Sequence, residues 1–366
     1  MARDLTHSLA DTTWFERDTT PSKIEAAVRE LQIEHAAQGE HGAVFPARVL
    51  NLVAVVDRPW RGEIENRLER VGRYHASRTV LCAVEPGRTT IDARVTVVTD
   101  EEPVAGEITT THEHLVLDIG ESHLEHLDTI IDPIVVTDMP TMLWSPHGRW
   151  NAVDALLGLA QVVLLDSVDE PDPEDAVHRA CALSERVYVV DLAWLRSTPW
   201  RERIAASFDP PRWRAQLPTI SSVEIRHHPE SVVAGVLLFG WLASRLGWTP
   251  GALAWRRDTL EGHARNRKGE VRLALHPDPS LSVRGLAGIT IETGQGTVLD
   301  LDRGEGGLHA RRVTRGTRAD GHTERTWTVL GASRGEAGIL GEGIRQALLR
   351  DPTYRPALEA AQIMVG

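Results

Sequence analysis

The stretch VYVVDLAWLRSTPWRE, residues 187–202, joins a strand to a helix through a short polar turn. Its apolar start, 187–190, is typical of a short buried strand. Thr198-Pro199 is typical of a helix start, because the N–H that proline lacks has no partner in the first turn of a helix. Similar alternation of strands and helices extends from about residue 130 to 210. This pattern favours an α/β layer with parallel strands.

The N-terminal half shows further apolar runs of strand length. Strands are predicted at 48–56, 79–84, 91–98, 108–119 and 162–165. Helices are predicted at 20–37, 57–71, 172–185 and 198–207, and a capping box of Ser333 and Glu336 predicts another that ends near Arg350. Run 48–56 is almost continuously apolar, which is typical of a strand buried on both faces.

The pattern changes after Trp248. From residue 252 to 329, alternating strand-like runs are separated by glycine turns, which predicts antiparallel hairpins. The acidic, proline-bearing stretch 169–173 is the expected domain boundary. We therefore predict an α/β (α+β) protein with an N-terminal mixed-sheet α/β domain, 1–170, and a C-terminal domain, 171–366, with an antiparallel sheet and flanking helices.

Composition excludes several classes of partner. The formal net charge is −12, and a nucleic-acid binder needs a basic footprint instead. No basic patch for a membrane surface stands out, and the apolar run 231–248 is short for a membrane span, so we expect a buried helix there. The N-terminal residues lack the apolar segment of an export signal. We expect a cytoplasmic protein without nucleic-acid or membrane partners.

The two cysteines, Cys82 and Cys181, both lie in apolar surroundings in the sequence. Two such thiols in a long chain indicate a reducing compartment and not a disulfide framework. A buried thiol reacts slowly because its pKa is raised, so we do not expect a thiol redox switch.

One pattern allows a metal site. His112 and His114 alternate with Glu113 in a predicted strand, which places both imidazoles on one face. A third ligand would come from elsewhere, with His123, His126 and Asp118 as candidates. A strand with a polar face explains the same residues, so the metal site stays an alternative.

Other catalytic patterns are missing from the sequence. The loop 144–149, Trp-Ser-Pro-His-Gly-Arg, follows a short apolar run, but no Gly-x-Ser-x-Gly elbow is present. No Gly-x-Gly-x-x-Gly follows a strand, and there is no P-loop. We expect no catalytic residue and no cofactor.

Two tryptophans and two arginines are concentrated in the opening stretch. Trp194, Arg196, Trp200 and Arg201 are of the residue types that anchor protein interfaces, because they bury large areas and make directional polar contacts. We predict that they bind a partner. The alternative is that both indoles pack in the core against the helix 231–248.

Several runs resemble one family. They are 139–144, 163–167, 191–194 with 198–202, 208–209, 240–248, 333–337 and 348–354. Together they resemble the OpcA family of glucose-6-phosphate dehydrogenase assembly proteins, from about Val49 to Ala360. The resemblance implies a non-catalytic partner that binds glucose-6-phosphate dehydrogenase, promotes its active oligomer and supports NADPH supply in the oxidative pentose phosphate pathway.

Two alternatives remain beside this interpretation. One is a metal-dependent hydrolase that uses His112 and His114. The other is a regulatory protein that binds a sugar phosphate through its arginines.

Overall fold

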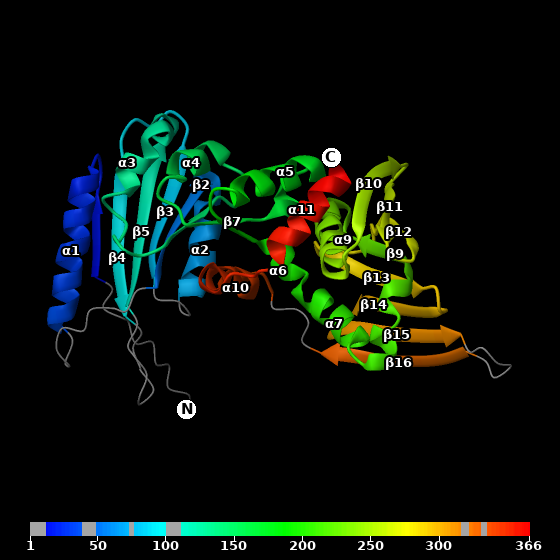
Figure 1. The fold of residues 1–366 in the computed structure, drawn as a ribbon. Coiled ribbons are helices and arrows are strands. Elements are labelled where there is room, and N and C mark those ends of the chain that lie inside the picture. The colour runs from blue at the N-terminus through cyan, green and yellow to red at the C-terminus, as the bar shows by residue number, and fades with distance from the viewer. Residues whose placement is uncertain (1–11, 39–48, 73–76, 100–110, 316–321, 331–334) are drawn as a thin grey trace, which may run out of the picture. The chain divides into compact units, whose positions relative to one another are not determined.

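The computed structural model describes residues 12–38, 49–72, 77–99, 111–315, 322–330 and 335–366 (Figure 1). The chain divides into two compact units, residues 1–165 and 166–366. The predicted domain boundary at 169–173 lies close to this division. Among the helices of the described residues, none is long and apolar enough to cross a membrane.

A mainly parallel sheet forms the centre of the first unit. Its strands are β1 (Thr12–Glu16), β2 (Leu50–Asp57), β3 (Ser77–Glu85), β4 (Asp92–Thr99), β5 (Thr111–Gly120), β6 (Thr141–Trp144) and β7 (Val162–Leu165). Their order within this unit is β1-β4-β5-β3-β2-β6-β7. The five strands from β5 to β7 pair in parallel, whereas β1 and β4 pair antiparallel. Along the chain, these parallel strands have the spatial order 3-2-1-4-5, so the order reverses between β2 and β6.

Helices connect these strands. They are α1 (Pro21–Gln38), η1 (Arg58–Trp60), α2 (Arg61–Gly72), η2 (Glu121–His126), α3 (Leu127–Ile131) and α4 (Trp150–Leu156). Residues 50–56 of β2 are all buried, as the continuous apolar run predicted. Parallel strands need such crossover connections, and helices cover their apolar side chains.

The second unit begins with helices around one short strand. These elements are η3 (Ser167–Asp169), α5 (Pro173–Ser184), β8 (Tyr188–Asp191), α6 (Leu192–Arg196), α7 (Thr198–Phe208), α8 (Pro211–Arg214), η4 (Leu217–Thr219), η5 (Pro229–Ser231), α9 (Val232–Leu246), α10 (Gly335–Leu349) and α11 (Tyr354–Val365). Asp172 accepts hydrogen bonds from the backbone N–H groups of Glu174 and Asp175, which confirms the predicted start of α5.

A large sheet completes this unit. Its strands are β9 (Ile220–His227), β10 (Thr249–Arg256), β11 (Thr259–Asn266), β12 (Gly269–Pro277), β13 (Leu286–Thr293), β14 (Thr297–Gly304), β15 (Gly307–Arg315) and β16 (His322–Leu330), in the order β10-β11-β12-β9-β13-β14-β15-β16. The hairpins expected over 252–329 are present, but β9 and β12 pair in parallel at the centre. Helix α9 crosses between β9 and β10, so the two hairpin groups continue the sheet on either side of β9.

The predicted α/β class with two sheets is confirmed. Some boundaries differ. Strand β5 is described from Thr111, and residues 108–110 of the predicted strand lie outside the described residues, as does the capping residue Ser333. The helix expected from residue 57 begins with the single turn η1 and continues as α2.

Helix α9 is the buried core helix that the apolar run predicted. The helix packs on β9 and β12, and α11 packs against it (Figure 1). Gly240 allows the close approach, because a Cβ there would lie 2.1 Å from the carbonyl oxygen of Ala357 in α11. No side chain fits at this point without moving one helix away from the other.

We therefore expect Gly240→Ala to lower the free energy of unfolding by about 2–3 kcal/mol through overpacking. Urea unfolding at constant pH measures this. The matched control is Gly341→Ala in α10, where a Cβ meets nothing within 4 Å. That control is expected to stabilise by roughly 0.5–1 kcal/mol, because alanine restricts the unfolded chain. An unchanged urea midpoint for Gly240→Ala would contradict the predicted clash.

Candidate functional site

A buried carboxylate organises the residues that follow β8. Asp191 accepts hydrogen bonds from the backbone N–H of Ala193 at 2.9 Å and of Ser167 at 3.1 Å. The Ser167 hydroxyl donates to it at 2.5 Å and the Tyr354 hydroxyl at 3.1 Å. Asp191 therefore caps α6 and also connects it to η3 and α11.

The protonation of Asp191 reflects this setting. Burial, followed by the nearby carboxylate of Asp166, raises the pKa of Asp191 to about 6. Asp166 itself is paired with Arg196 at 2.7 Å. The four donors favour the ionised form of Asp191, but burial in a low-dielectric interior outweighs them.

A second cluster surrounds Trp194. The indole Nε1 donates to Asp351 at 2.8 Å, and the guanidinium of Arg201 lies 3.6 Å from the centre of the indole ring. Arg201 also donates to the hydroxyls of Ser197 and Thr198. Burial lowers the pKa of Arg201 to about 10, although Asp351 opposes the shift. The cluster is a buried cation–π and hydrogen-bond arrangement that holds α6 and α7 together.

The structure thus places most of the predicted partner-binding residues in the interior. Trp194 is 2% exposed, Trp200 is 3% exposed and Arg201 is 8% exposed. The side chain of Arg196 is 18% exposed and paired with Asp166. Helix α6, which carries Trp194, packs against α9, the helix named in the alternative of core packing. The partner contact of this segment stays a prediction, and Arg196 is its most accessible member.

The candidate metal ligands lie on β5. His112 and His114 pair in register with Val98 and Thr96 of β4, so they share a face of the sheet as expected. Burial lowers the pKa of His114 to about 4, so the imidazole is neutral. Two of the three candidate third ligands have other contacts. Asp118 accepts from Arg61 at 2.9 Å, and His123 accepts from the backbone N–H of Gly120 at 3.0 Å. Within the described ranges, no group of three potential ligands gathers, so the metal alternative gains no support from the structure.

Both cysteines have raised pKa values. Burial raises the pKa of Cys82 to about 12 and that of Cys181 to about 11. Thiols with such values are weak nucleophiles at neutral pH. Cys82 is buried, as the apolar run around it predicted, whereas Cys181 is partly exposed and lies near the charged side chains of Glu359, Glu185 and Arg355.

The edge where the strand order reverses holds the polar cluster that the sequence did not predict. Arg149, in the loop after β6, donates through Nε to Asp57 at the end of β2 at 2.8 Å. Its backbone N–H donates to the Ser145 hydroxyl at 2.8 Å. Trp60 and His147 stack with ring centres 4.7 Å apart. In folds with this strand order, a ligand binds at this edge, outside the carboxyl ends of the strands.

More arginine–carboxylate pairs continue along the same edge. Arg58 pairs with Glu85 at the end of β3 at 2.9 Å, and Arg61 pairs with Asp118 of β5 at 2.9 Å. The cluster of arginines 58, 61 and 149 with acids 57, 85 and 118, together with Trp60 and His147, is called the switch-point cluster below. Burial lowers the pKa of His147, which favours the neutral ring in the stack.

These residues do not fit a dinucleotide. A pyrophosphate needs glycines for close backbone approach and free N–H donors at the first strand–helix turn. Here the turn after β2 carries Arg58, Pro59 and Trp60; Pro59 has no N–H, and the indole of Trp60 stacks on His147. The loop 144–149 and the helix start after Asp57 lie far apart in the sequence. The sequence feature that could have pointed to this cluster is that each segment directly follows a buried strand.

Two family models match the chain, and both describe a "Glucose-6-phosphate dehydrogenase subunit". Residues 69–182 match the model of its N-terminal domain, and residues 187–358 match the model of its C-terminal domain. The chain belongs to the OpcA family. This membership confirms the resemblance found in the sequence.

Curated OpcA proteins are similar to part of the chain, and a solved structure is similar in fold to most of it. "Putative OxPP cycle protein OpcA" of Synechocystis sp. is 28% identical over 155 residues, which cover 41% of this chain and 33% of that protein. The Nostoc punctiforme protein of the same name is 31% identical over 142 residues, covering 38% and 30%. The matched stretch thus spans about a third of these OpcA relatives. Glucose-6-phosphate 1-dehydrogenase from Mycobacterium avium has the same overall fold, with a TM-score of 0.52, 10% identity and coverage of 87% and 91%.

The raised pKa of Asp191 predicts a pH dependence of stability in this OpcA-family chain. Because the folded pKa of about 6 exceeds the ordinary value of 3.8, the folded state retains a proton that the unfolded state loses between about pH 4 and 6. This group therefore makes the free energy of unfolding fall as the pH rises through that window. In Asp191→Asn the contribution is absent, so the stability advantage of the wild type over the variant should shrink by about 1–3 kcal/mol from pH 4 to 7.

Urea unfolding of both proteins at several pH values tests this. Asp258→Asn, at an exposed position in the turn between β10 and β11, is the control and should leave the pH dependence unchanged. The assignment to Asp191 is wrong if the difference between wild type and Asp191→Asn is constant or grows with pH.

Proposed function

We propose that this chain is a non-catalytic partner of glucose-6-phosphate dehydrogenase that binds the enzyme and promotes its active oligomer. The observation that carries the proposal is the match of both halves of the chain to the two domain models of the OpcA family. The name of the curated relatives, an OxPP cycle protein, supports a role in the oxidative pentose phosphate pathway and hence in NADPH supply. A cytoplasmic location follows from that partner.

The switch-point cluster supports the non-catalytic part of the proposal. Dehydrogenases that use this strand order bind the pyrophosphate at the turn after the first strand. In this chain Asp57 and Arg149 pair across that position, and Pro59 removes a backbone donor. Where a dehydrogenase has groups that hold a dinucleotide, this chain therefore has side chains that bind one another.

Activation by a partner has a simple thermodynamic form. A protein that binds the active oligomer more tightly than the inactive form shifts the equilibrium between them by its difference in affinity. No chemistry is required of the partner. A tenfold preference for the active form corresponds to about 1.4 kcal/mol.

The first test titrates the cognate glucose-6-phosphate dehydrogenase with this protein while activity and complex mass are followed together. We expect a saturable rise in activity that coincides with a larger complex by analytical ultracentrifugation. Titration of the enzyme with albumin controls for nonspecific stabilisation. No complex and no change in activity would overturn the proposed function.

We also propose that the segment 191–202 contributes to the partner surface through Arg196, while Trp194, Trp200 and Arg201 hold its conformation. Arg196→Gln is expected to weaken activation by about tenfold in apparent affinity, the effect of losing one charged interface contact. Arg186→Gln, at an exposed position near the end of α5, removes the same charge elsewhere and should activate fully. Full activation by a normally folded Arg196→Gln variant would rule out this contact.

A further inference from the structure

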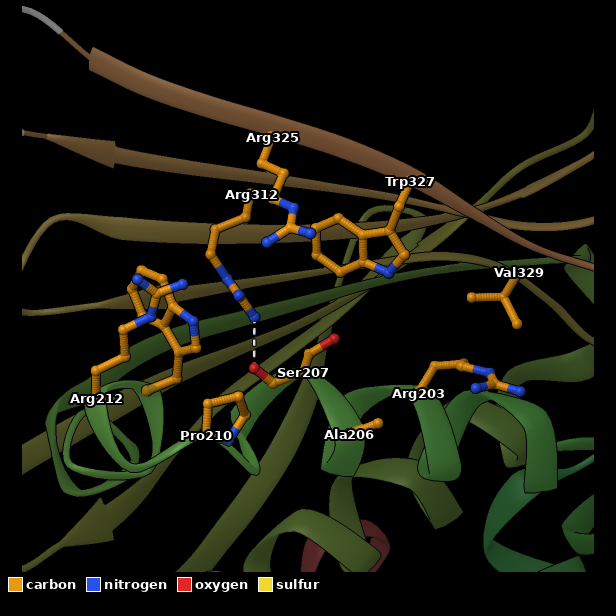
Figure 2. A pocket seen from close by; sticks show the side chains of 10 residues that line it. Arg203, Ala206, Ser207, Pro210, Arg212, Arg312, Arg325, Trp327 and Val329 are labelled. Carbon is orange, nitrogen blue, oxygen red and sulfur yellow. Dashed lines mark hydrogen bonds between the residues drawn. The ribbon is translucent and has the colours of Figure 1, made fainter.

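A pocket lies between α7–α8 and the hairpin β15–β16 in the second unit. Figure 2 shows its side chains reaching toward one another from the helices and from the two strands. Its volume is about 390 Å³, the size of a small-molecule site. It is lined by Arg203, Ala206, Ser207, Pro210, Arg212, Trp213, Arg312, Arg325, Trp327 and Val329.

Four of these residues are arginines, and none is acidic. Arg312 of β15 and Arg325 of β16 lie directly opposite each other in the strand pairing. Like charges directly opposite in a sheet destabilise it. Burial lowers the pKa of Arg312. The positive charges of Arg212 and Arg325 lower this pKa further, because like charges repel each other. The lining therefore carries a concentration of positive charge in a chain whose net charge is −12.

The opposite face of the same hairpin is built differently. Arg311, next to Arg312 on β15, pairs with Glu324 at 2.8 Å and with Asp300 at 3.4 Å. Ordinary charge complementarity is thus present one residue away. The contrast makes the pocket face a specific arrangement and not a general property of this arginine-rich hairpin.

Aromatic rings and backbone fix the central arginine. Arg312 donates to the carbonyl oxygen of Ser207 at the end of α7. Its guanidinium lies 4.3 Å from the ring centre of Trp213 and 5.4 Å from that of Trp327. Across the pocket, the buried Nε of Arg203 has no hydrogen-bond partner. The guanidinium of Arg312 is therefore held in place before any ligand arrives, which reduces the entropy lost on binding.

We propose that this pocket binds a small organic phosphate. A phosphate dianion supplies the charge and the acceptor oxygens that several guanidinium groups prefer. Trp327 and Val329 in the lining offer apolar surface to the ring that carries the phosphate, either a sugar or a base. A site of this volume takes a small molecule. This proposal concerns binding by the chain alone and does not rest on the proposed dehydrogenase partner.

The test is calorimetric titration of the full chain with glucose 6-phosphate, AMP and inorganic phosphate, and with glucose and adenosine as uncharged counterparts. We expect saturable binding of at least one organic phosphate, at least about tenfold tighter than its uncharged counterpart, as charge-assisted hydrogen bonds provide. The sugar and nucleotide arms identify which ring the pocket accepts. No binding of any organic phosphate, or binding no tighter than that of the uncharged counterpart, would overturn the proposal.

Arg325→Glu is the decisive variant, because Arg325 is exposed and its change places a carboxylate opposite Arg312. We expect phosphate binding to fall by about 100-fold, since one attraction is lost and one repulsion is added. The thermal midpoint without ligand should rise, because the like-charge pair is replaced by an attractive one. A merely structural role of Arg325 would not produce both effects.

Arg267→Glu, at an exposed position in the turn between β11 and β12, makes the same charge change on the same sheet and should bind as the wild type does. Equal binding by wild type and Arg325→Glu would overturn the proposal. A second combination of results would also overturn it: the wild type binds no phosphate, and Arg325→Glu loses dehydrogenase activation. That combination would assign the arginines to the binding of an acidic segment of the partner. Because ligand binding is measured without the dehydrogenase, its failure is separate from failure of the proposed function.

Discussion

The second unit depends on the buried carboxylate of Asp191. Its hydrogen bonds join Ser167 in η3 and Ala193 in α6 to Tyr354 at the start of α11, which lies 163 positions later in the chain. The donors compensate for the cost of burying a carboxyl group, and the raised pKa shows that the compensation is incomplete. Such a residue specifies one arrangement of the three segments, because any other arrangement leaves its oxygens without partners. The nearby Trp194–Arg201 cluster, which also reaches Asp351, extends the same constraint to α7.

At the switch-point cluster, the requirements of the sheet can be separated from the chemistry of its edge. The parallel strands need only apolar side chains and crossover helices to form, and residues 50–56 of β2 supply these. The turn that follows β2 is not required for the sheet, so Arg58, Pro59 and Trp60 are tolerated there. Because fold and function separate in this way, the likeness in fold to a dehydrogenase carries no activity with it, and the residues at the edge decide what can bind.

The parts of the fold that were predictable rest on local chemistry. Asp172 and Pro173 begin α5 through hydrogen bonds within one turn, and the apolar run of α9 requires burial wherever it packs. The parallel pairing of β9 with β12 was missed because it depends on strands that are far apart in sequence. Trp194 and Arg201 are of residue types that anchor interfaces, so the sequence alone could not tell a buried cluster from an exposed one. Their contacts with Asp351 and Tyr354, which follow about 150 residues later, show that the cluster is buried. The arginines of the pocket come from two helices and two strands, so no sequence window contains them together.

Helix α7 gives the two main features of the second unit a physical connection. It begins at Thr198, in contact with Arg201 of the buried cluster, and the carbonyl of Ser207 near its end holds Arg312 of the pocket. The helix that bonds to Arg312 of the pocket therefore also carries Trp200 and Arg201 of the segment 191–202. If a phosphate raises the affinity for the dehydrogenase by some factor, the dehydrogenase must raise the affinity for that phosphate by the same factor. Reciprocity therefore makes coupling between the pocket and the partner measurable from either side, and the two affinities must agree whichever ligand is added first.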